Sequence, residues 1–251
     1  MSKTISIHSF RGGTGKSNLT ASIACIVAAR GKRVAVIDTD VQSPGIHILF
    51  GLGEGMVHRT LNDYLWGRCP VEETATDVTP GPVREAGGSV RLIPSSLSPG
   101  EIARVLREGY DVGRLIDGIH ALNQRLELDY LFIDTHPGLN EETLLSITIS
   151  DALAVVLRPD SQDYQGSAVT VELARKLDVP RLLLVVNKIP AAFEPAVIAE
   201  KVAKAYGAPV AGTLPECAEM MQLASSDIFA LRYPDHPMTA AIRDIASQLV
   251  D

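Results

Sequence analysis

A glycine-rich stretch near the start of the chain combines the residue types that bind phosphate. Gly12, Gly13 and Gly15 precede Lys16 and Ser17. Because glycine has no Cβ atom, such a stretch lets backbone N–H groups wrap closely around an anion. A lysine at this position would reach the β- and γ-phosphates of a nucleotide, and a serine hydroxyl would bind a magnesium ion. The alternative interpretation is a glycine-rich turn without a ligand.

Two elements must position this stretch. The alternating run at residues 4–8 predicts a short strand, and the run at residues 19–30 predicts a helix that ends at Gly31. Backbone N–H groups converge on an anion where a loop enters the N-terminus of a helix. The order of strand, glycine-rich stretch and helix therefore favours a phosphate-binding loop.

Acidic residues end two apolar runs further along the chain. Residues 33–38 end in Asp38 and residues 130–134 end in Asp134. Continuous apolar runs are typical of parallel strands covered on both faces, and ligands bind at the carboxyl ends of such strands. Asp134 is followed by a turn with Gly138, the Walker B arrangement, in which a carboxylate holds magnesium through its waters. An acid at a buried strand end is costly unless it is paired or linked to a metal, which favours function over a merely polar turn.

Two further side chains follow these strands. A carboxylate such as Asp40 near a γ-phosphate can orient a water molecule for in-line attack. His136 could contact a switch region or a partner, but the sequence favours a solvated loop histidine.

The glycine-rich stretch departs from the usual P-loop pattern, because Phe10 stands where that pattern has its first glycine. Arg11-Gly12-Gly13-Thr14-Gly15-Lys16-Ser17 instead resembles the deviant Walker A motif of the MinD/ParA family, with Arg11 in place of the family's signature lysine. The resemblance covers essentially the whole chain and is least specific at residues 54–127.

The resemblance implies roles for individual residues. The acid matching Asp40 activates water in this family, and the one matching Asp38 sits near the metal and the phosphate loop. The asparagine matching Asn187 reads the adenine edge, and the turn that contains Pro215 resembles the second base-contacting turn; an Asn-Lys pair alone is also common in loops. The implied nucleotide-binding residues are Gly12, Gly13, Thr14, Gly15, Lys16, Ser17, Asn18, Asn187 and Pro215; the implied magnesium ligands are Ser17, Asp38 and Asp134; and the implied catalytic residues are Arg11, Lys16 and Asp40.

Arg11 carries the implication of a dimer. In the family, the signature lysine reaches the phosphates bound by the facing subunit, so that two subunits enclose two ATP molecules. Arginine is permanently charged and binds phosphate oxygens in a bidentate manner, so it suits this role in trans, like an arginine finger. Arg11 could also act within its own subunit or lie exposed.

The remaining sequence predicts one α/β domain over residues 1–251, a doubly wound and mostly parallel sheet flanked by helices. Strands are expected at residues 90–94, 152–157, 181–187 and near 210, with helices at 61–66, 100–108, 112–126, 141–150, 167–177, 195–206, 218–224 and 238–249. Residues 51–59 are expected to form a flexible connection and residues 77–89 an irregular loop or hairpin. This alternation of strands and helices is typical of a mostly parallel sheet.

Composition limits the partners and the compartment. A net charge of −7 gives no support for binding DNA, and four arginines that could contact it also fit ordinary solvated helix faces: Arg104, Arg107, Arg114 and Arg125. The three cysteines are far apart, which disfavours both a disulfide framework and an iron–sulfur carrier. We expect a cytoplasmic protein without a signal peptide or a direct membrane anchor, because no apolar run approaches about 20 residues.

The resemblance implies an Mg²⁺-dependent ATPase, slow and stimulated by a partner, that dimerises with ATP and positions or partitions a cellular cargo through an activator or adaptor protein. Two alternatives stay open. One is an ATP-dependent amide-forming or carboxylating ligase of the same fold, which needs a second substrate pocket. The other is a nucleotide-sensing scaffold that hydrolyses ATP poorly.

Overall fold

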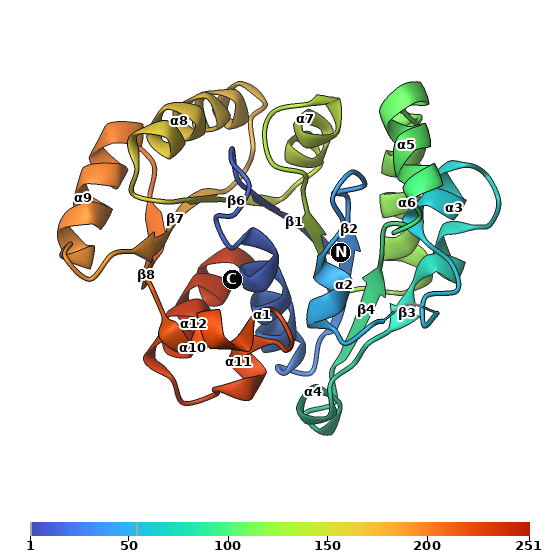
Figure 1. Cartoon of the computed structure of the whole chain (residues 1–251), viewed down its shortest axis with the longest axis horizontal. Helices are drawn as coiled ribbons and strands as arrows, with labels where there is room; N and C mark the ends of the chain where they lie inside the picture. Colours follow the sequence, from blue (N-terminus) through green and yellow to red (C-terminus); the bar gives the residue numbers. More distant parts are fainter. Residues whose placement is uncertain (1, 54) are drawn as a thin grey trace.

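One sheet organises the molecule. The computed structural model describes residues 2–53 and 55–251, and in these residues eight strands lie in the order β3-β4-β2-β5-β1-β6-β7-β8 (Figure 1). The strands are β1 Lys3–His8, β2 Arg33–Asp38, β3 Thr76–Asp77, β4 Ser89–Ile93, β5 Tyr130–Asp134, β6 Ala152–Leu157, β7 Leu182–Ile189 and β8 Val210–Pro215. Every neighbouring pair is parallel except β3 with β4. The predicted doubly wound, mostly parallel sheet is therefore confirmed.

Helices cover both faces of this sheet. Figure 1 shows α1 with α10, α11 and α12 on one side, and α7, α8 and α9 on the other, with α3, α5 and α6 toward the β3 edge. The helices are α1 Lys16–Ala28, α2 Ile46–Leu49, α3 Leu61–Leu65, α4 Gly81–Glu85, α5 Pro99–Glu108, α6 Val112–Arg125, α7 Glu141–Thr148, α8 Ser161–Lys176, α9 Pro195–Tyr206, α10 Ala218–Leu223, α11 Phe229–Arg232 and α12 Pro237–Val250, with a short 3-10 helix at Val71–Thr74. No helix in the described ranges has both the length and the apolar character needed to cross a membrane.

Side chains that alternate along each strand build a core on either face. In β2, Val34 and Val36 pack into the cluster that includes α1 and α12, whereas Ala35 and Ile37 pack into the cluster with α3 and α6. Successive side chains of a strand point to opposite faces, so an apolar run such as Val34–Ile37 contributes to both cores. Because both faces of the central strands are buried, their sequences are continuous apolar runs.

The order of the strands places three chain segments at one point. β1 lies between β5 and β6, and β5 in turn pairs with β2. The register sets Ile7 beside Asp134 and sets Asp38 beside Asp134. The loops that leave β1, β2 and β5 therefore meet at the carboxyl edge of the sheet, where open α/β sheets bind ligands.

Two segments differ from the sequence-based expectation. The helix expected at residues 167–177 begins six residues earlier, at Ser161, because the Asp160 side chain accepts hydrogen bonds from the backbone N–H groups of Gln162 and Asp163 and caps it. The segment at residues 77–89 contains the helix α4, and β3 before it pairs antiparallel with β4. The connection expected over residues 51–59 includes Glu54, which lies outside the described residues.

Candidate nucleotide-binding site

The glycine-rich stretch links β1 directly to α1, as the sequence predicts. Gly13 and Gly15 have φ angles of +77° and +90°, a region that other residues rarely adopt. A Cβ atom on Gly15 would lie 2.5 Å from the Asn187 side-chain nitrogen, so this position needs glycine for space as well. α1 begins at Lys16, immediately after the loop, so its free N–H groups face the same point as the loop. This backbone is suited to hold an anion.

A buried ion pair joins the loop to the end of β5. Lys16 Nζ lies 2.7 Å from Asp134 Oδ1, and the two side chains are only 7% and 1% exposed. The Thr20 hydroxyl donates to the same oxygen at 3.1 Å. The lysine expected to reach phosphate and the acid expected at the metal are thus brought together.

Asp38 completes an acidic group beside this ion pair. The side chain is fully buried and accepts hydrogen bonds from the N–H groups of Asp40 at 3.0 Å and Gly45 at 3.4 Å. Burial, and after it the neighbouring Asp134 carboxylate, raises the pKa of Asp38 well above its ordinary value. Two carboxyl groups thus face one ammonium group. Such a set of oxygen ligands fits a divalent cation, which would favour the ionised form of Asp38.

Asp40 pairs with His136, and here the expectation of a solvated loop histidine is wrong. His136 Nδ1 lies 2.6 Å from Asp40 Oδ1, and the side chains are 22% and 14% exposed. The hydrogen bond to Asp40 raises the pKa of His136 above its ordinary value. The loops after β2 and β5 meet because these strands are neighbours, which brings together residues 96 positions apart.

The Arg11 side chain lies beside two acids at the start of α8. Its Nη1 lies 3.8 Å from Asp160 Oδ1, and its Nε lies 4.0 Å from Asp163 Oδ1. The side chain remains 39% exposed, and Asp163 also pairs with Arg158 at 3.0 Å. Asp163 is buried, but at 3.8 and 4.0 Å neither contact is a hydrogen bond, so the two acids hold the Arg11 side chain only weakly.

A cavity of about 340 Å³ opens beside the loop, on the side of α10 and α12. Its wall contains four of the predicted nucleotide-binding residues, Gly15, Asn18, Asn187 and Pro215, together with apolar side chains such as Met238. The volume lies in the range of small-molecule sites, which are mostly apolar with a few polar groups. Gly15, just before α1, and Pro215, at the end of β8, thus line the same pocket although they are about 200 positions apart in the sequence.

The Asn187 amide is hydrogen-bonded to the phosphate loop. Its nitrogen donates to the Thr14 carbonyl oxygen at 2.7 Å, and its oxygen accepts from the Lys188 N–H at 2.9 Å. Lys188 Nζ donates to the Gly13 carbonyl oxygen at 2.8 Å. These two bonds use one of the two N–H hydrogens and one of the two oxygen lone pairs of the amide, so it keeps hydrogen-bonding capacity for a base edge.

Comparison with known proteins identifies the family. The ParA family profile, described as NUBPL iron-transfer P-loop NTPase, matches residues 1–250. The chain belongs to the ParA family. Its MinD- and ParA-like members are P-loop ATPases, and this ParA-family protein is an ATPase.

The relatives of this chain carry names that describe several functions. The chain is 28% identical over its whole length to an uncharacterized ATP-binding protein of Methanocaldococcus jannaschii, covering 88% of that protein. A chromosome partitioning protein ParA of Caulobacter vibrioides is 30% identical over 72% of this chain and 66% of its own. An iron-sulfur cluster carrier protein of Pyrococcus furiosus is 24% identical over 98% of this chain and 85% of its own.

Solved structures share the fold. The septum site-determining protein MinD of Pyrococcus horikoshii, complexed with Mg-ADP, has a TM-score of 0.82 at 21% identity, with 99% of this chain and 96% of that chain covered. A MinD of Aquifex aeolicus has a TM-score of 0.80 at 22% identity, with 98% and 96% covered.

Two buried residues of this site were not predicted from the sequence. His8 ends β1, and its Nδ1 lies 2.8 Å from the Thr135 hydroxyl; burial, aided by Lys16, lowers the pKa of His8 to about 3, so the ring is neutral. Glu142 in α7 accepts a hydrogen bond from the Tyr110 hydroxyl at 2.7 Å, and burial raises its pKa. The position of His8 at the end of the strand before the loop could have identified it as a residue of the site. No sequence pattern identified Glu142, because acidic residues are common in the first turn of a helix.

Proposed function

We propose that this ATPase is a nucleotide-driven switch that forms an ATP-enclosing homodimer and, through an adaptor or activator protein, positions or partitions a cellular cargo. The observation that carries the proposal is the position of Lys16 and Asp134 at the loop, directly beside the cavity walled by Asn187 and Pro215. In this proposal, the groups assigned to phosphate, to the metal and to the base would form one continuous site.

The roles of the loop residues follow from their chemistry. The backbone N–H groups of residues 12–18 bind the phosphates, and the Lys16 ammonium shifts from Asp134 toward them. Thr14 has a buried hydroxyl without a partner among the described residues, so it too is available to the ligand. Ser17, Asp38 and Asp134 would hold magnesium, which neutralises the negative charge that the phosphates bring.

Asp40 is the residue we assign to the attacking water. Its carboxylate is partly exposed at the carboxyl edge of the sheet, and His136 holds one of its oxygens at 2.6 Å. The other oxygen can accept a hydrogen bond from water and so orient it for in-line attack. Because His136 fixes the carboxylate, the pair favours hydrolysis over a purely scaffolding function.

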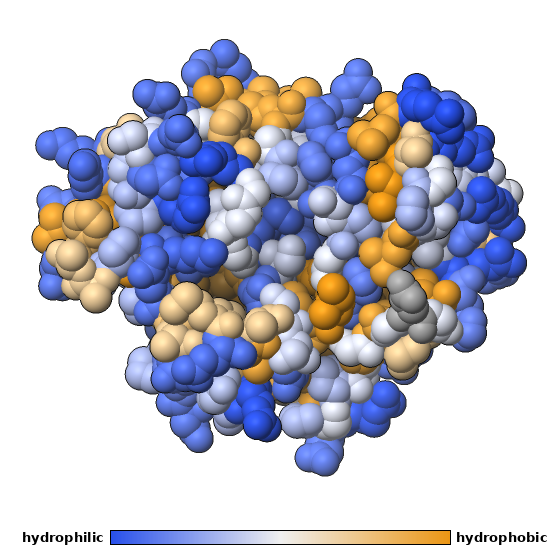
Figure 2. Space-filling view, viewed as in Figure 1, coloured by the Kyte–Doolittle hydropathy of each residue, from blue (hydrophilic) through white to orange (hydrophobic). Residues whose placement is uncertain are grey.

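Arg11 supports a dimer in which each subunit completes the other's site. Its guanidinium is part exposed and only loosely held by Asp160, so it can swing toward a facing nucleotide. Exposed apolar side chains of the same edge include Ile48 in α2, Leu97 before α5 and Leu106 in α5. Figure 2 shows apolar surface over α2 and beside α5, bordering the paler centre of this face. A second copy would cover such a surface.

The relatives include both site-determining or partitioning proteins and iron-sulfur cluster carriers, and two features of this chain favour a positioning role over carriage or ligation. The matched proteins include a flagellum site-determining protein of Helicobacter pylori, 26% identical over 74% of this chain, besides the Caulobacter ParA. The cysteines of this chain are far apart in sequence, unlike the paired cysteines that iron–sulfur carriage requires. A ligase needs a second substrate pocket beside the γ-phosphate. The cavity described here is instead walled by Asn187 and Pro215, the residues assigned to the base, so it does not supply such a pocket.

Light scattering combined with phosphate release tests the proposal. We expect a monomer without nucleotide and with ADP, and a dimer with ATP and magnesium. Arg11→Ala should weaken that dimer at least tenfold while leaving ADP affinity unchanged. Arg33→Ala is the matched control, because Arg33 is half exposed at the amino end of β2, the opposite edge of the sheet. A wild-type monomer in every state, or equal dimerisation by the Arg11 variant, would contradict the switch.

A further inference from the structure

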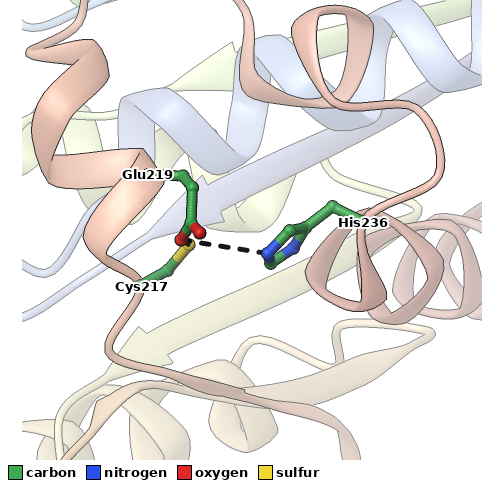
Figure 3. A group of neighbouring side chains, drawn as sticks. All are labelled: Cys217, Glu219 and His236. Atoms are coloured by element: carbon green, nitrogen blue, oxygen red, sulfur yellow. Dashed lines mark hydrogen bonds and ion pairs between the residues drawn. The ribbon is translucent and has the colours of Figure 1, made fainter.

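A second group of chemically reactive side chains lies outside the catalytic site. Cys217 precedes α10, Glu219 lies in its first turn, and His236 precedes α12. Their potential ligand atoms all lie within 4.8 Å of one another, and among the described residues they form the one such group of three. Figure 3 shows the three side chains converging from two separate segments of the chain. Neither the phosphate loop nor the acidic residues that we assign to hydrolysis use them.

The geometry of this group approaches that of a three-ligand metal site. Cys217 Sγ lies 3.2 Å from Glu219 Oε2, and His236 Nε2 lies 3.9 Å from the same oxygen. In a tetrahedral zinc site, with bond lengths of roughly 2.0–2.3 Å, ligand atoms are about 3.4–3.6 Å apart. Small side-chain movements would therefore let all three atoms contact one ion. Glu219 is 46% exposed, so water can reach a fourth position.

We propose that Cys217, Glu219 and His236 bind a divalent transition-metal ion of the zinc class. A thiolate with an imidazole selects zinc over magnesium or calcium, which prefer oxygen ligands. The thiolate and the carboxylate together carry two negative charges, so the occupied site is neutral. Metal binding releases one proton from the Cys217 thiol, because the thiolate, and not the thiol, is the form that binds a metal.

His236 also caps α12, and loss of this cap on metal binding lowers the metal affinity. His236 Nδ1 accepts a hydrogen bond from the Met238 N–H at 3.1 Å, which places the proton of the neutral ring on Nε2. Coordination through Nε2 moves that proton to Nδ1 and breaks the cap. Loss of an N-cap weakens metal affinity by about tenfold, which a three-ligand site can tolerate.

The position of the group gives the ion a structural consequence. Cys217, Glu216 and Met238 also wall the cavity beside the phosphate loop. A bound ion would join the segment after β8 to the start of α12, and so fix two parts of this wall. The inference concerns metal binding by the protein without nucleotide, so it holds or fails independently of the proposed switch.

Cobalt titration of the metal-free 251-residue chain tests the inference, since Co²⁺ bound to a thiolate gives a charge-transfer absorption band. We expect one equivalent of Co²⁺ to produce the band and Zn²⁺ to displace it. Cys217→Ser should abolish the band. Cys69→Ser should keep it, because Cys69 is a buried thiol in the other core of the sheet.

The variant His236→Asn separates a ligand from a helix cap, because asparagine caps helices well but has no imidazole. We expect its melting temperature to match that of the wild type and its cobalt affinity to fall at least tenfold. Absence of the band in the wild type, an unchanged band in Cys217→Ser, or unchanged cobalt affinity in His236→Asn would each overturn the inference.

Discussion

The pairing of His136 with Asp40 makes a quantitative prediction about hydrolysis. Replacing His136 by Leu removes the donor that holds Asp40 Oδ1 at 2.6 Å. A hydrogen bond to a charged group contributes about 1.5–3 kcal/mol, and the lower end applies because both side chains are partly exposed. Loss of about 1.5 kcal/mol lowers the share of correctly oriented carboxylate, and with it kcat, by about tenfold.

A second substitution at the same position serves as the control. In His136→Asn, the side-chain nitrogen of the introduced asparagine can occupy nearly the place of His136 Nδ1, because each atom is bonded to Cγ. His136→Asn should therefore retain most of the activity that His136→Leu loses.

The assay is phosphate release at saturating ATP and magnesium, with nucleotide affinity measured separately. His136 is not among the residues that wall the cavity, so affinity should stay within about twofold of the wild type in both variants. Wild-type turnover by the Leu variant would refute a role for His136 in positioning Asp40. An equal loss in the Asn and Leu variants would refute the argument that the Nδ1 hydrogen bond is what matters.

Three further predictions concern the same site. Asp40→Ala should lower ATP turnover by at least about a hundredfold and accumulate the nucleotide-bound dimer, and unaltered phosphate release would remove Asp40 from catalysis. Gly15→Ala should lower nucleotide affinity at least tenfold, because its φ is +90° and its Cβ would meet the Asn187 side chain at 2.5 Å, whereas Gly81→Ala, with nothing within 4 Å, should bind normally in the same titration. Because Asp40 raises the pKa of His136 above 6.5, the pair's contribution to stability is complete below pH 6.5 and is lost as the pH rises through the raised pKa. The difference in melting temperature between the wild type and His136→Leu should therefore narrow above neutral pH, and a difference that is constant with pH would show that the pairing contributes through packing alone.

Local patterns in the sequence were sufficient for the fold and for the outline of the site. Apolar runs such as the one in β2 predict buried parallel strands because their side chains must enter cores on both faces. The glycines before Lys16 predict the loop because its backbone needs positive φ angles. The acids at the ends of β2 and β5 predict an acidic edge because parallel strands end on the same side.

Local patterns failed where a contact joins distant segments. His136 reads as a solvated loop residue until β5 is placed beside β2, which brings its ring to Asp40. The start of α8 was missed because an apolar period does not reveal that the Asp160 side chain caps the helix.

The sequence by itself determined which chemical groups this protein has and that strand ends would gather them at one edge. Only the tertiary structure decided which groups touch. Three contacts are visible only in the tertiary structure: Arg11 lies near Asp160, Asn187 is hydrogen-bonded to the phosphate loop, and Cys217 lies near His236. The physical reason is that propensity and periodicity act over a few neighbouring residues, whereas these contacts depend on the order of strands in the sheet and on how the helices pack against it.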